Sequence, residues 1–213
     1  MEKLDYKKQD LWQPELKNIQ SPIRLIGSDA EIIEKRAFEV TENYFAMGMH
    51  SKINNLSILA QGQTEIDGRI YSLQEVHFHH VAEHGFEGEE ELRPLEIHFV
   101  HQNSLGQVAV VAVTMKIGKE NPVIQKVIAA MQDHYQITEK FSLTELIPTQ
   151  GHYLRYLGSL TTPPLSEGVE WVVFESPQEL SLKQLDQYVA AFPDHNNRKF
   201  QEINGRTIQK FSI

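Results

Sequence analysis

The stretch EVHFH, residues 75–79, combines strand-like alternation with two histidines. In a β-strand alternate side chains share one face, so we expect Glu75, His77 and His79 to point to the same side of a sheet. Two imidazoles on one face lie about 7 Å apart along the strand, close enough to share one metal ion. Taken alone, a His-x-His pair is a weak signal for a metal, and it more often marks two histidines that face solvent.

A second stretch, LEIHFVH at residues 95–101, alternates in the same way. Between the two stretches lie Glu- and Gly-rich residues, enough to let the second strand return beside the first, so that a third imidazole meets the first two. Three neutral histidines leave the fourth position of tetrahedral zinc open, which is typical of catalytic sites. Glu75 and Glu96, each two residues from a histidine on its own face, are expected to accept the second imidazole N–H groups.

Strand-like alternation recurs through most of the chain and predicts a mainly β fold. The expected strands are residues 37–46, 56–60, 69–80, 95–101, 108–117, 153–157, 169–175 and 207–211. Asp67-Gly68, between two of these ranges, predicts a tight hairpin, and Asn204-Gly205 predicts another turn. Because hairpin signals dominate, we expect a large twisted, mostly antiparallel or mixed sheet in one α+β domain over residues 1–213.

Two segments are expected to form helices at the periphery of this sheet. Asn121 followed by Pro122 is typical of an N-cap and a first helical position. Ser181 with Gln184 matches a capping box at the start of the second helix. The apolar residues that we expect in the core are Ile124, Val127, Ile128 and Met131 in the first helix, and Leu182, Leu185 and Val189 in the second.

Composition narrows the classes of function. With 29 acidic against 20 basic residues, the formal net charge is −9, which argues against binding to nucleic acids or anionic membranes. The chain has no cysteine, so a disulfide scaffold, an iron–sulfur cluster and a cysteine zinc site are excluded. Any metal must therefore be held by histidines and carboxylates.

The first residues, MEKLDYKKQDLWQ, contain no apolar run typical of a signal peptide. No stretch approaches the roughly 18 apolar residues that a membrane-spanning helix needs. We therefore expect a cytoplasmic protein. A secreted precursor that was trimmed before an initiator Met was added fits the same sequence.

Strings spread over nearly the whole chain carry a family resemblance. They are QSPI at 20–23, HFH at 77–79, AEH at 82–84, LEIHFVH at 95–101, GSLTTPPLSEG at 158–168, NR at 197–198 and NGR at 204–206. In this order they resemble the α-class carbonic anhydrases of bacterial type. The resemblance implies a large twisted, mostly antiparallel sheet with zinc at the base of a cone-shaped cleft. It also implies a carbonate dehydratase, a lyase that converts CO2 reversibly to bicarbonate and a proton by attack of zinc-bound hydroxide.

The resemblance assigns the metal ligands by position. It makes His77, His79 and His98 the ligands of Zn2+, and it makes Glu96 the carboxylate that holds the third ligand. Glu75 stands two residues before the first ligand, where the family usually has Gln. A carboxylate at that position is expected to make His77 a stronger donor and the bound water slightly less acidic.

The string at 158–168 is implied to orient the nucleophile. By resemblance, Thr161 accepts a hydrogen bond from zinc-bound hydroxide and gives its own proton to a buried carboxylate, Glu83, which aims a hydroxide lone pair at carbon. Tyr6 is the candidate for the aromatic residue that supports this Thr–Glu bond. The implied substrate contacts are Val100, Val110, Leu160, Thr162, Val169 and Trp171. Because apolar strand residues are core by default, only the resemblance singles out the apolar members of this group.

Two further positions depart from the family pattern. The usual proton-shuttling histidine is missing from KINNLS at residues 52–57, and His50, a few residues earlier, is the expected substitute. His80 follows the second ligand, where animal members carry Trp. We regard His80 as the next candidate for proton transfer, although its strand position faces away from the metal.

Two other functions fit parts of the sequence. A silent carbonic anhydrase-related binding protein would share the fold, but such proteins have lost a zinc ligand, whereas the three ligands, Thr161 and Glu83 are all present here. A cupin-type metalloenzyme fits His77 and His79 with Glu83 as a further ligand, but the later part of the cupin motif is missing. The expected partner is the small-molecule substrate, CO2 or bicarbonate, and a homodimer is the expected assembly.

Overall fold

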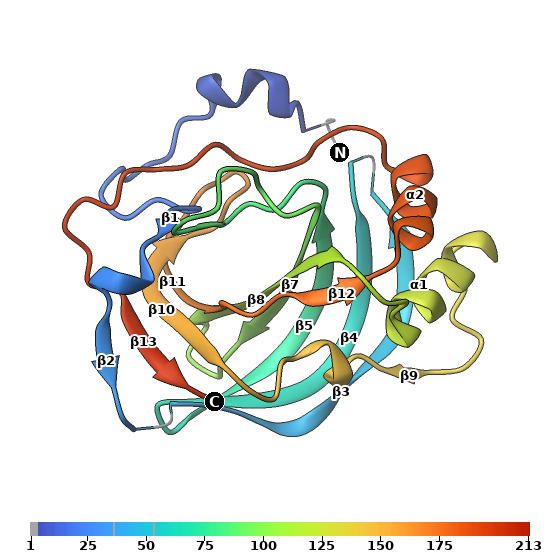
Figure 1. Cartoon of the computed structure of the whole chain (residues 1–213), viewed down its shortest axis with the longest axis horizontal. Coiled ribbons are helices and arrows are strands. Elements are labelled where there is room, and N and C mark those ends of the chain that lie inside the picture. The colour runs from blue at the N-terminus through green and yellow to red at the C-terminus, as the bar shows by residue number, and fades with distance from the viewer. Residues whose placement is uncertain (1–3, 36, 53) are drawn as a thin grey trace.

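The chain folds around strands that are mostly long and strongly curved (Figure 1). The computed structural model describes residues 4–35, 37–52 and 54–213. The strands are β1 (Arg24–Leu25), β2 (Glu31–Ile33), β3 (Phe38–Ser51), β4 (Leu56–Ile66), β5 (Arg69–His79), β6 (Gly85–Phe86), β7 (Leu95–Gln102), β8 (Val108–Ile117), β9 (Phe141–Ser142), β10 (His152–Ser159), β11 (Glu167–Phe174), β12 (Gln178–Leu180) and β13 (Gln209–Ser212). The helices are α1 (Pro122–Gln132), α2 (Leu182–Ala191) and the 3-10 helices η1 (Tyr6–Leu11), η2 (Gly27–Asp29) and η3 (Thr144–Leu146).

Eleven strands form one mixed sheet in the part of the chain that the structure describes. Their order is β2-β13-β10-β11-β8-β7-β5-β4-β3-β9, with β12 paired to β8. The pairs β11–β8, β12–β8 and β13–β2 are parallel, and the other pairs in this sheet are antiparallel. The predicted mainly β fold with a mostly antiparallel, mixed sheet is therefore confirmed. All eight expected strands form, whereas β1, β2, β6, β9 and β12 are too short, at two or three residues, for alternation to reveal them.

Both faces of the sheet are buried along its centre, and β8 shows why. Its residues Val111 and Val113 pack into the larger apolar cluster, whereas Val110 and Ala112 pack into a smaller cluster on the opposite face. A strand buried on both sides needs apolar residues at every position, so β8 reads as a nearly continuous apolar run. The smaller cluster lies on the face that carries the histidines, because His98 pairs directly with Ala112.

The predicted hairpin and the second predicted turn are both present. Asp67 and Gly68 join β4 to β5 with φ of 49° and 76°, so both residues adopt the left-handed conformation of a type I′ turn. Asn204 and Gly205 repeat the pattern with φ of 50° and 69°. Gly and Asn tolerate this region of backbone space better than most residues, which is why these pairs were informative in the sequence.

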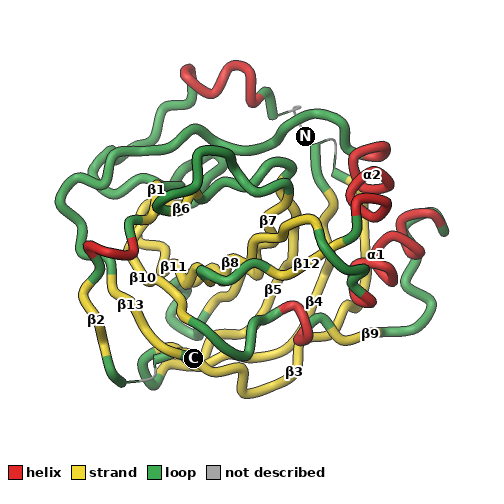
Figure 2. Tube along the Cα trace, viewed as in Figure 1, coloured by secondary structure: helices red, strands yellow, loops and turns green. Residues whose placement is uncertain are grey.

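The two α-helices lie side by side at one flank of the sheet (Figure 2). Hydrogen bonds between Asn121 and Gln184 link their N-termini. The Asn121 side chain accepts hydrogen bonds from the first turn of α1, and Ser181 and Gln184 form the expected capping box of α2. The buried Gln184 side chain also accepts from the Asn121 N–H and donates to the Asn121 carbonyl. Within the described ranges, no helix is long and apolar enough to cross a membrane.

One expectation about α2 is wrong. Leu182 was expected in the core, but it is 58% exposed. The bridge made by Gln184 turns the face that carries Gln184 and Tyr188 inward, so Leu182 is left at the surface. In α1 the four expected residues are all buried, because there the apolar stripe and the packing face coincide.

His101 points into the larger core rather than toward the other histidines. It is fully buried; its Nδ1 donates to the Phe99 carbonyl at 2.8 Å, and its Nε2 lies 3.0 Å from the Tyr44 hydroxyl. Burial lowers the pKa of His101 to about 4, from an ordinary 6.5. The folded protein therefore holds this ring neutral over a pH range in which the unfolded chain protonates it.

This difference predicts a loss of stability in mild acid. As pH falls below 6.5, the unfolded state binds a proton on His101 that the folded state binds only near pH 4, so between pH 7 and 5 the wild type loses about 2 kcal/mol through this group. The His101→Gln variant lacks this titrating group. The difference in unfolding free energy by which the variant is less stable than the wild type should therefore be smaller at pH 5 than at pH 7, by about 2 kcal/mol. Urea denaturation of both metal-free proteins at pH 7 and 5 measures this. A deficit that stays constant would show that His101 does not titrate in this way.

Candidate functional site

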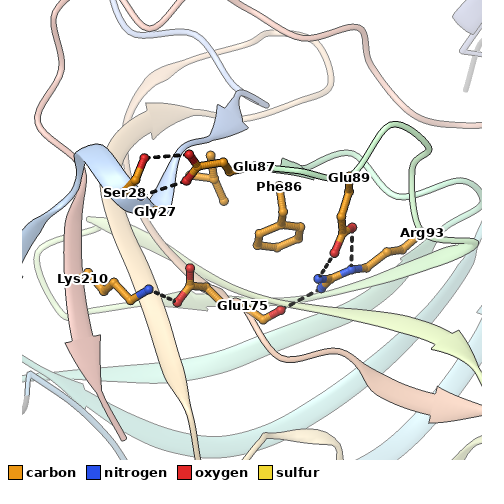
Figure 3. Close-up of a pocket in the computed structure, with 9 residues that line it drawn as sticks. Gly27, Ser28, Phe86, Glu87, Glu89, Arg93, Glu175 and Lys210 are labelled. Carbon is orange, nitrogen blue, oxygen red and sulfur yellow. Dashed lines mark hydrogen bonds and ion pairs between the residues drawn. The ribbon is translucent and has the colours of Figure 1, made fainter.

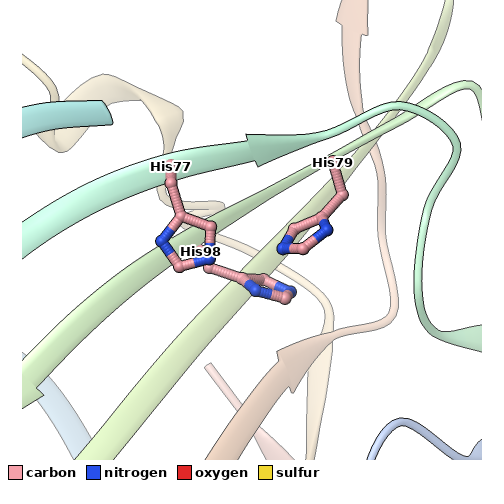
Figure 4. A group of neighbouring side chains, drawn as sticks. All are labelled: His77, His79 and His98. Carbon is pink, nitrogen blue, oxygen red and sulfur yellow. The ribbon is translucent and has the colours of Figure 1, made fainter. Parts of the chain in front are cut away.

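Three histidines from two adjacent strands converge on one point (Figure 4). His77 and His79 lie at the end of β5, and His98 lies on β7 directly opposite His77 in the pairing register. The ring centroids of the three pairs are 4.5 to 5.2 Å apart. One nitrogen of each ring lies within 4.8 Å of the corresponding nitrogens of the other two. The predicted strand faces thus bring these side chains together in the structure.

His98 is held from behind by a buried carboxylate, as expected for Glu96. Its Nε2 donates to Oε1 of Glu96 at 2.7 Å, which leaves Nδ1 to face the other two histidines. Glu96 also accepts from His84 Nδ1 at 2.6 Å and from the backbone N–H groups of Glu83 and His84, both at 2.8 Å. Burial alone would raise the pKa of Glu96, but the neighbouring His84 ring and these hydrogen bonds hold it well below its usual 4.5.

A second trio, His84, Glu96 and His98, is also close enough for metal binding. Its polar atoms are already used: His84 contacts Glu96 through Nδ1 and the Tyr156 hydroxyl through Nε2 at 2.7 Å. This trio is therefore a hydrogen-bonded support for His98. The metal-binding group that the geometry favours is His77, His79 and His98.

His79 is oriented by a residue far along the chain. Its Nδ1 donates to the backbone carbonyl of Asn196 at 2.9 Å, from the segment that follows α2. Its Nε2 is buried and has no hydrogen-bond partner among the described residues. A buried nitrogen lone pair with no partner, aimed at two other imidazoles, fits a metal ligand better than a core histidine.

His77 lies beside a charged pair. Its Nδ1 is 3.2 Å from Oε1 of Glu75, and both Glu75 oxygens contact Nζ of Lys52 at 2.8 and 2.9 Å. Burial raises the pKa of Glu75, but His77 and Lys52 together outweigh burial and lower it to about 2. Glu75 is thus anionic, as expected, but Lys52 offsets its charge, so its effect on His77 is smaller than a lone carboxylate would have.

Burial keeps the three imidazoles neutral. It lowers the pKa of His77, lowers that of His79 to about 4, and lowers that of His98 well below 6.5. At neutral pH each ring therefore carries a lone pair rather than a second proton. Neutral imidazoles are the form in which histidine binds a metal ion.

Glu83 and Thr161 meet beside the three histidines. Oε1 of Glu83 accepts the backbone N–H of Arg198 at 2.8 Å, and Oε2 lies 3.6 Å from Nε2 of His79. Burial raises the pKa of Glu83 to about 7, against the lowering effects of Arg198 and the Thr161 hydroxyl. Tyr6 lies close enough to Glu83 that the carboxylate raises the already elevated pKa of its buried phenol. The structure thus brings Tyr6, Glu83 and Thr161 into one neighbourhood.

The expected apolar substrate contacts lie together in the smaller apolar cluster. Trp171 is fully buried, packs its ring 5.0 Å from that of His98, and donates from Nε1 to the Ser159 carbonyl. Val100 is half-buried and lies between Glu75 and Val110 in the register of neighbouring strands. The remaining members are Leu160 and Val169, and Thr162 is half-buried in the loop beside them.

The two candidates for proton transfer differ in position. His50 is exposed near the end of β3 and pairs with Ser57, which pairs with His77. Residues that pair directly share a face, so His50 lies on the face of His77, two strands or about 10 Å away. His80 is half-buried, follows β5, and packs its ring against His195.

Sequence reasoning assigned no role to several residues that complete the site. Arg198 donates its backbone N–H to Glu83 and its guanidinium to Gln20 Oε1 and the Ser21 carbonyl, at 2.8 and 2.6 Å. Gln20, Ser21 and Arg198 belong to strings that carry the family resemblance, and that was the only signal for them. Lys52 and Asn196 carried no signal, because only the folded chain brings them to the histidines.

A separate surface pocket of about 310 Å³ lies away from the histidines (Figure 3). Its charged groups all have partners: Arg93 binds Glu89, Lys210 binds Glu175, and Glu87 accepts hydrogen bonds from Ser28. The lining residues are Leu25, Gly27, Ser28, Phe86, Glu87, Glu89, Arg93, Glu175 and Lys210. Because these charges are mutually satisfied, the pocket offers no reactive group.

Comparison with known proteins agrees with this geometry. Residues 7–212 match the model of the eukaryotic-type carbonic anhydrase family. A carbonic anhydrase of Klebsiella pneumoniae is 36% identical over 200 residues, covering 89% of this chain and 78% of that protein. The structure of the α-carbonic anhydrase from Thermovibrio ammonificans, in complex with the inhibitor sulfanilamide, superposes with a TM-score of 0.79 at 34% identity, over 90% of this chain and 87% of the other. That of Photobacterium profundum α-carbonic anhydrase gives a TM-score of 0.83 at 27% identity, over 95% and 94%. This chain therefore belongs to the α-class, or eukaryotic-type, carbonic anhydrase family of enzymes.

Proposed function

We propose that this protein binds Zn2+ through His77, His79 and His98 and catalyses the reversible hydration of CO2 to bicarbonate and a proton. The observation that carries the proposal is the convergence of three neutral imidazoles, two of them buried and His77 partly buried. The nitrogen of each ring that is turned away from the centre faces a carboxylate or carbonyl oxygen. In carbonic anhydrases, zinc bound by three histidines is known to lower the pKa of water to about 7 and so to supply hydroxide at neutral pH.

Thr161 and Glu83 orient the nucleophile in this proposal. The Arg198 N–H holds one carboxylate oxygen of Glu83. In this proposal the neighbouring Thr161 hydroxyl donates a hydrogen bond to the same carboxylate, whose pKa it lowers. The Thr161 oxygen is then left to accept a hydrogen bond from the attacking group. Because a hydroxyl can donate only one proton, this arrangement selects one orientation of the nucleophile.

The apolar wall provides the place for CO2. Val100, Val110 and Trp171 adjoin the histidines through the pairing of β7, β8 and β11. An uncharged, apolar gas gains from contact with such a surface, whereas charged bicarbonate does not, so the wall favours release of the product. Leu160, Thr162 and Val169 complete the proposed contact surface at the loop.

The structure gives less support to the two alternative functions, a cupin-type metalloenzyme and a silent carbonic anhydrase-related binding protein. A cupin-type enzyme requires another fold and needs Glu83 as a ligand, whereas here Oε1 of Glu83 accepts the Arg198 N–H. A silent binding protein would not need a complete set of histidines with Thr161 and Glu83 beside them. The cytoplasmic location and the homodimer stay predictions from the sequence.

Loss of a ligand should remove both metal and activity. His77→Ala should lower zinc affinity by more than the roughly 10- to 100-fold that losing an outer partner of a ligand costs. Zinc analysis after dialysis, together with stopped-flow CO2 hydration, measures both effects. His152→Ala, which removes an exposed histidine elsewhere, serves as the control. A His77→Ala protein with full zinc content and full activity would sink the assignment.

Thr161 should affect the rate and not the metal. Thr161→Ala should retain zinc and lose roughly 10- to 1,000-fold in CO2 hydration, the scale for removing one positioned hydrogen-bonding group. Thr161→Ser keeps the hydroxyl and should stay close to the wild type. If Thr161→Ala loses zinc instead, the residue is structural.

Proton export through His50 should make the rate depend on buffer. The His50→Ala protein should turn over more slowly at low buffer concentration, and added imidazole should restore the rate, because a diffusible base replaces the side chain. The exchange of isotope between CO2 and bicarbonate at equilibrium should not change. If His50→Ala matches the wild type and the wild type is already fast at low buffer, His50 is not the relay and His80 is the next residue to replace.

A further inference from the structure

A second pair of histidines lies outside the proposed zinc centre. The rings of His80 and His195 are 4.9 Å apart between centroids and nearly perpendicular, at 83°. In the three-histidine centre the corresponding separations are 4.5, 5.1 and 5.2 Å. The second pair thus has the ring spacing of the three histidines that are proposed to share one metal ion, and the comparison rests on that proposal.

The backbone on both sides of this pair is fixed. Asn196 donates its N–H to the His80 carbonyl at 2.8 Å, and its side-chain oxygen accepts the His80 N–H at 2.7 Å. The buried Asn196 side chain also donates to the Phe78 carbonyl at 3.0 Å. Because His195 directly precedes Asn196, these bonds hold the two backbone segments that carry the rings beside each other without a metal. A ligand that binds here has little ordering entropy to overcome.

The donor chemistry suits a transition-metal ion. The Phe192 backbone lies beside the His80 ring, and a neutral imidazole carries a lone pair on one of its two nitrogens. Nδ1 of His80 is buried and makes no well-formed hydrogen bond with any described residue. His195 is exposed, so solvent reaches the pair and can fill the remaining coordination positions. The net charge of −9 favours the approach of cations.

We propose that His80 and His195 form a second binding site for a divalent transition-metal ion, of the class Zn2+, Ni2+ or Cu2+. Two imidazoles with water in the remaining positions suit these ions and not Mg2+ or Ca2+, which prefer oxygen ligands. The site is weaker than the three-histidine centre, because it offers fewer protein ligands and is open to solvent.

The two sites are distinct but adjacent. His79 and His80 are consecutive, and His79 is fully buried in the first centre, whereas His80 reaches the surface. Asn196 lies between them: its carbonyl holds His79 and its side chain holds His80. Zinc in excess is therefore expected to occupy the second site without displacing the first ion.

Equilibrium dialysis with Zn2+ counts the sites in the full-length protein. The wild type should bind one zinc tightly and a second more weakly, and His195→Gln should weaken only the second, by at least about 10-fold. His152→Gln, an exposed histidine on β10, is the matched control and should keep both. His98→Ala should lose the tight ion and keep the weak one, which separates this proposal from that of the catalytic centre.

A spectroscopic measurement identifies the ligands. Cu2+ added to the zinc-loaded protein should show the EPR hyperfine pattern of two nitrogen ligands, with no release of zinc, and His195→Gln should lose that pattern. A wild type that binds no second metal ion, or a His195→Gln protein that binds it as tightly as the wild type, overturns the proposal.

Discussion

The buried carboxylate of Glu96 accepts four hydrogen bonds, and the geometry of the site depends on it. A buried charge that is shielded from solvent needs hydrogen-bond donors fixed around it. A buried charge left without partners lowers the stability of the fold by several kcal/mol, on the order of 3–5. Those donors come from His98 on β7 and from residues 83–84 in the loop that follows β5. One carboxylate therefore positions a proposed ligand and, at the same time, the backbone that presents Glu83. Through His84 the same network reaches Tyr156 on β10.

The segment after α2 supplies hydrogen-bond partners to site residues that the sheet and its loops position. Asn196 and Arg198 contact His79 and Glu83, from which they are separated by 117 and 115 residues in the chain. Figure 1 shows this segment crossing above the strands beside the N-terminal residues, and Lys199 is bound there to Gln9 and Asp10. Because contacts of such long range form only when the chain has folded, the oriented histidines are a property of the whole domain.

The sheet serves two different purposes on its two faces. On one face the larger apolar cluster, with α1 and α2 packed against it, supplies most of the burial that stabilises the fold. On the other, the smaller cluster ends at His98 and Trp171 and leaves Val100 partly accessible. The proposed metal site thus lies at the border between the apolar wall and charged groups, with Glu75 on β5 and Lys52 just after the end of β3. Low polarity on one side and fixed charges on the other are what binding CO2 and exporting a proton require.

Local sequence was enough to predict the long strands, the hairpin at Asp67-Gly68 and the caps of both helices, because alternation and capping depend on neighbours in the chain. It also placed His77 and His79 on one face, since the side-chain period of a strand is two residues. Only the tertiary structure decided which residues surround those imidazoles: Asn196 binds His79, and Lys52 binds the Glu75 carboxylate beside His77. It likewise turned Leu182 outward, because Gln184 bonds to the other helix. Such contacts join residues that are distant in sequence, and no local pattern records which of many polar side chains will meet when the chain folds.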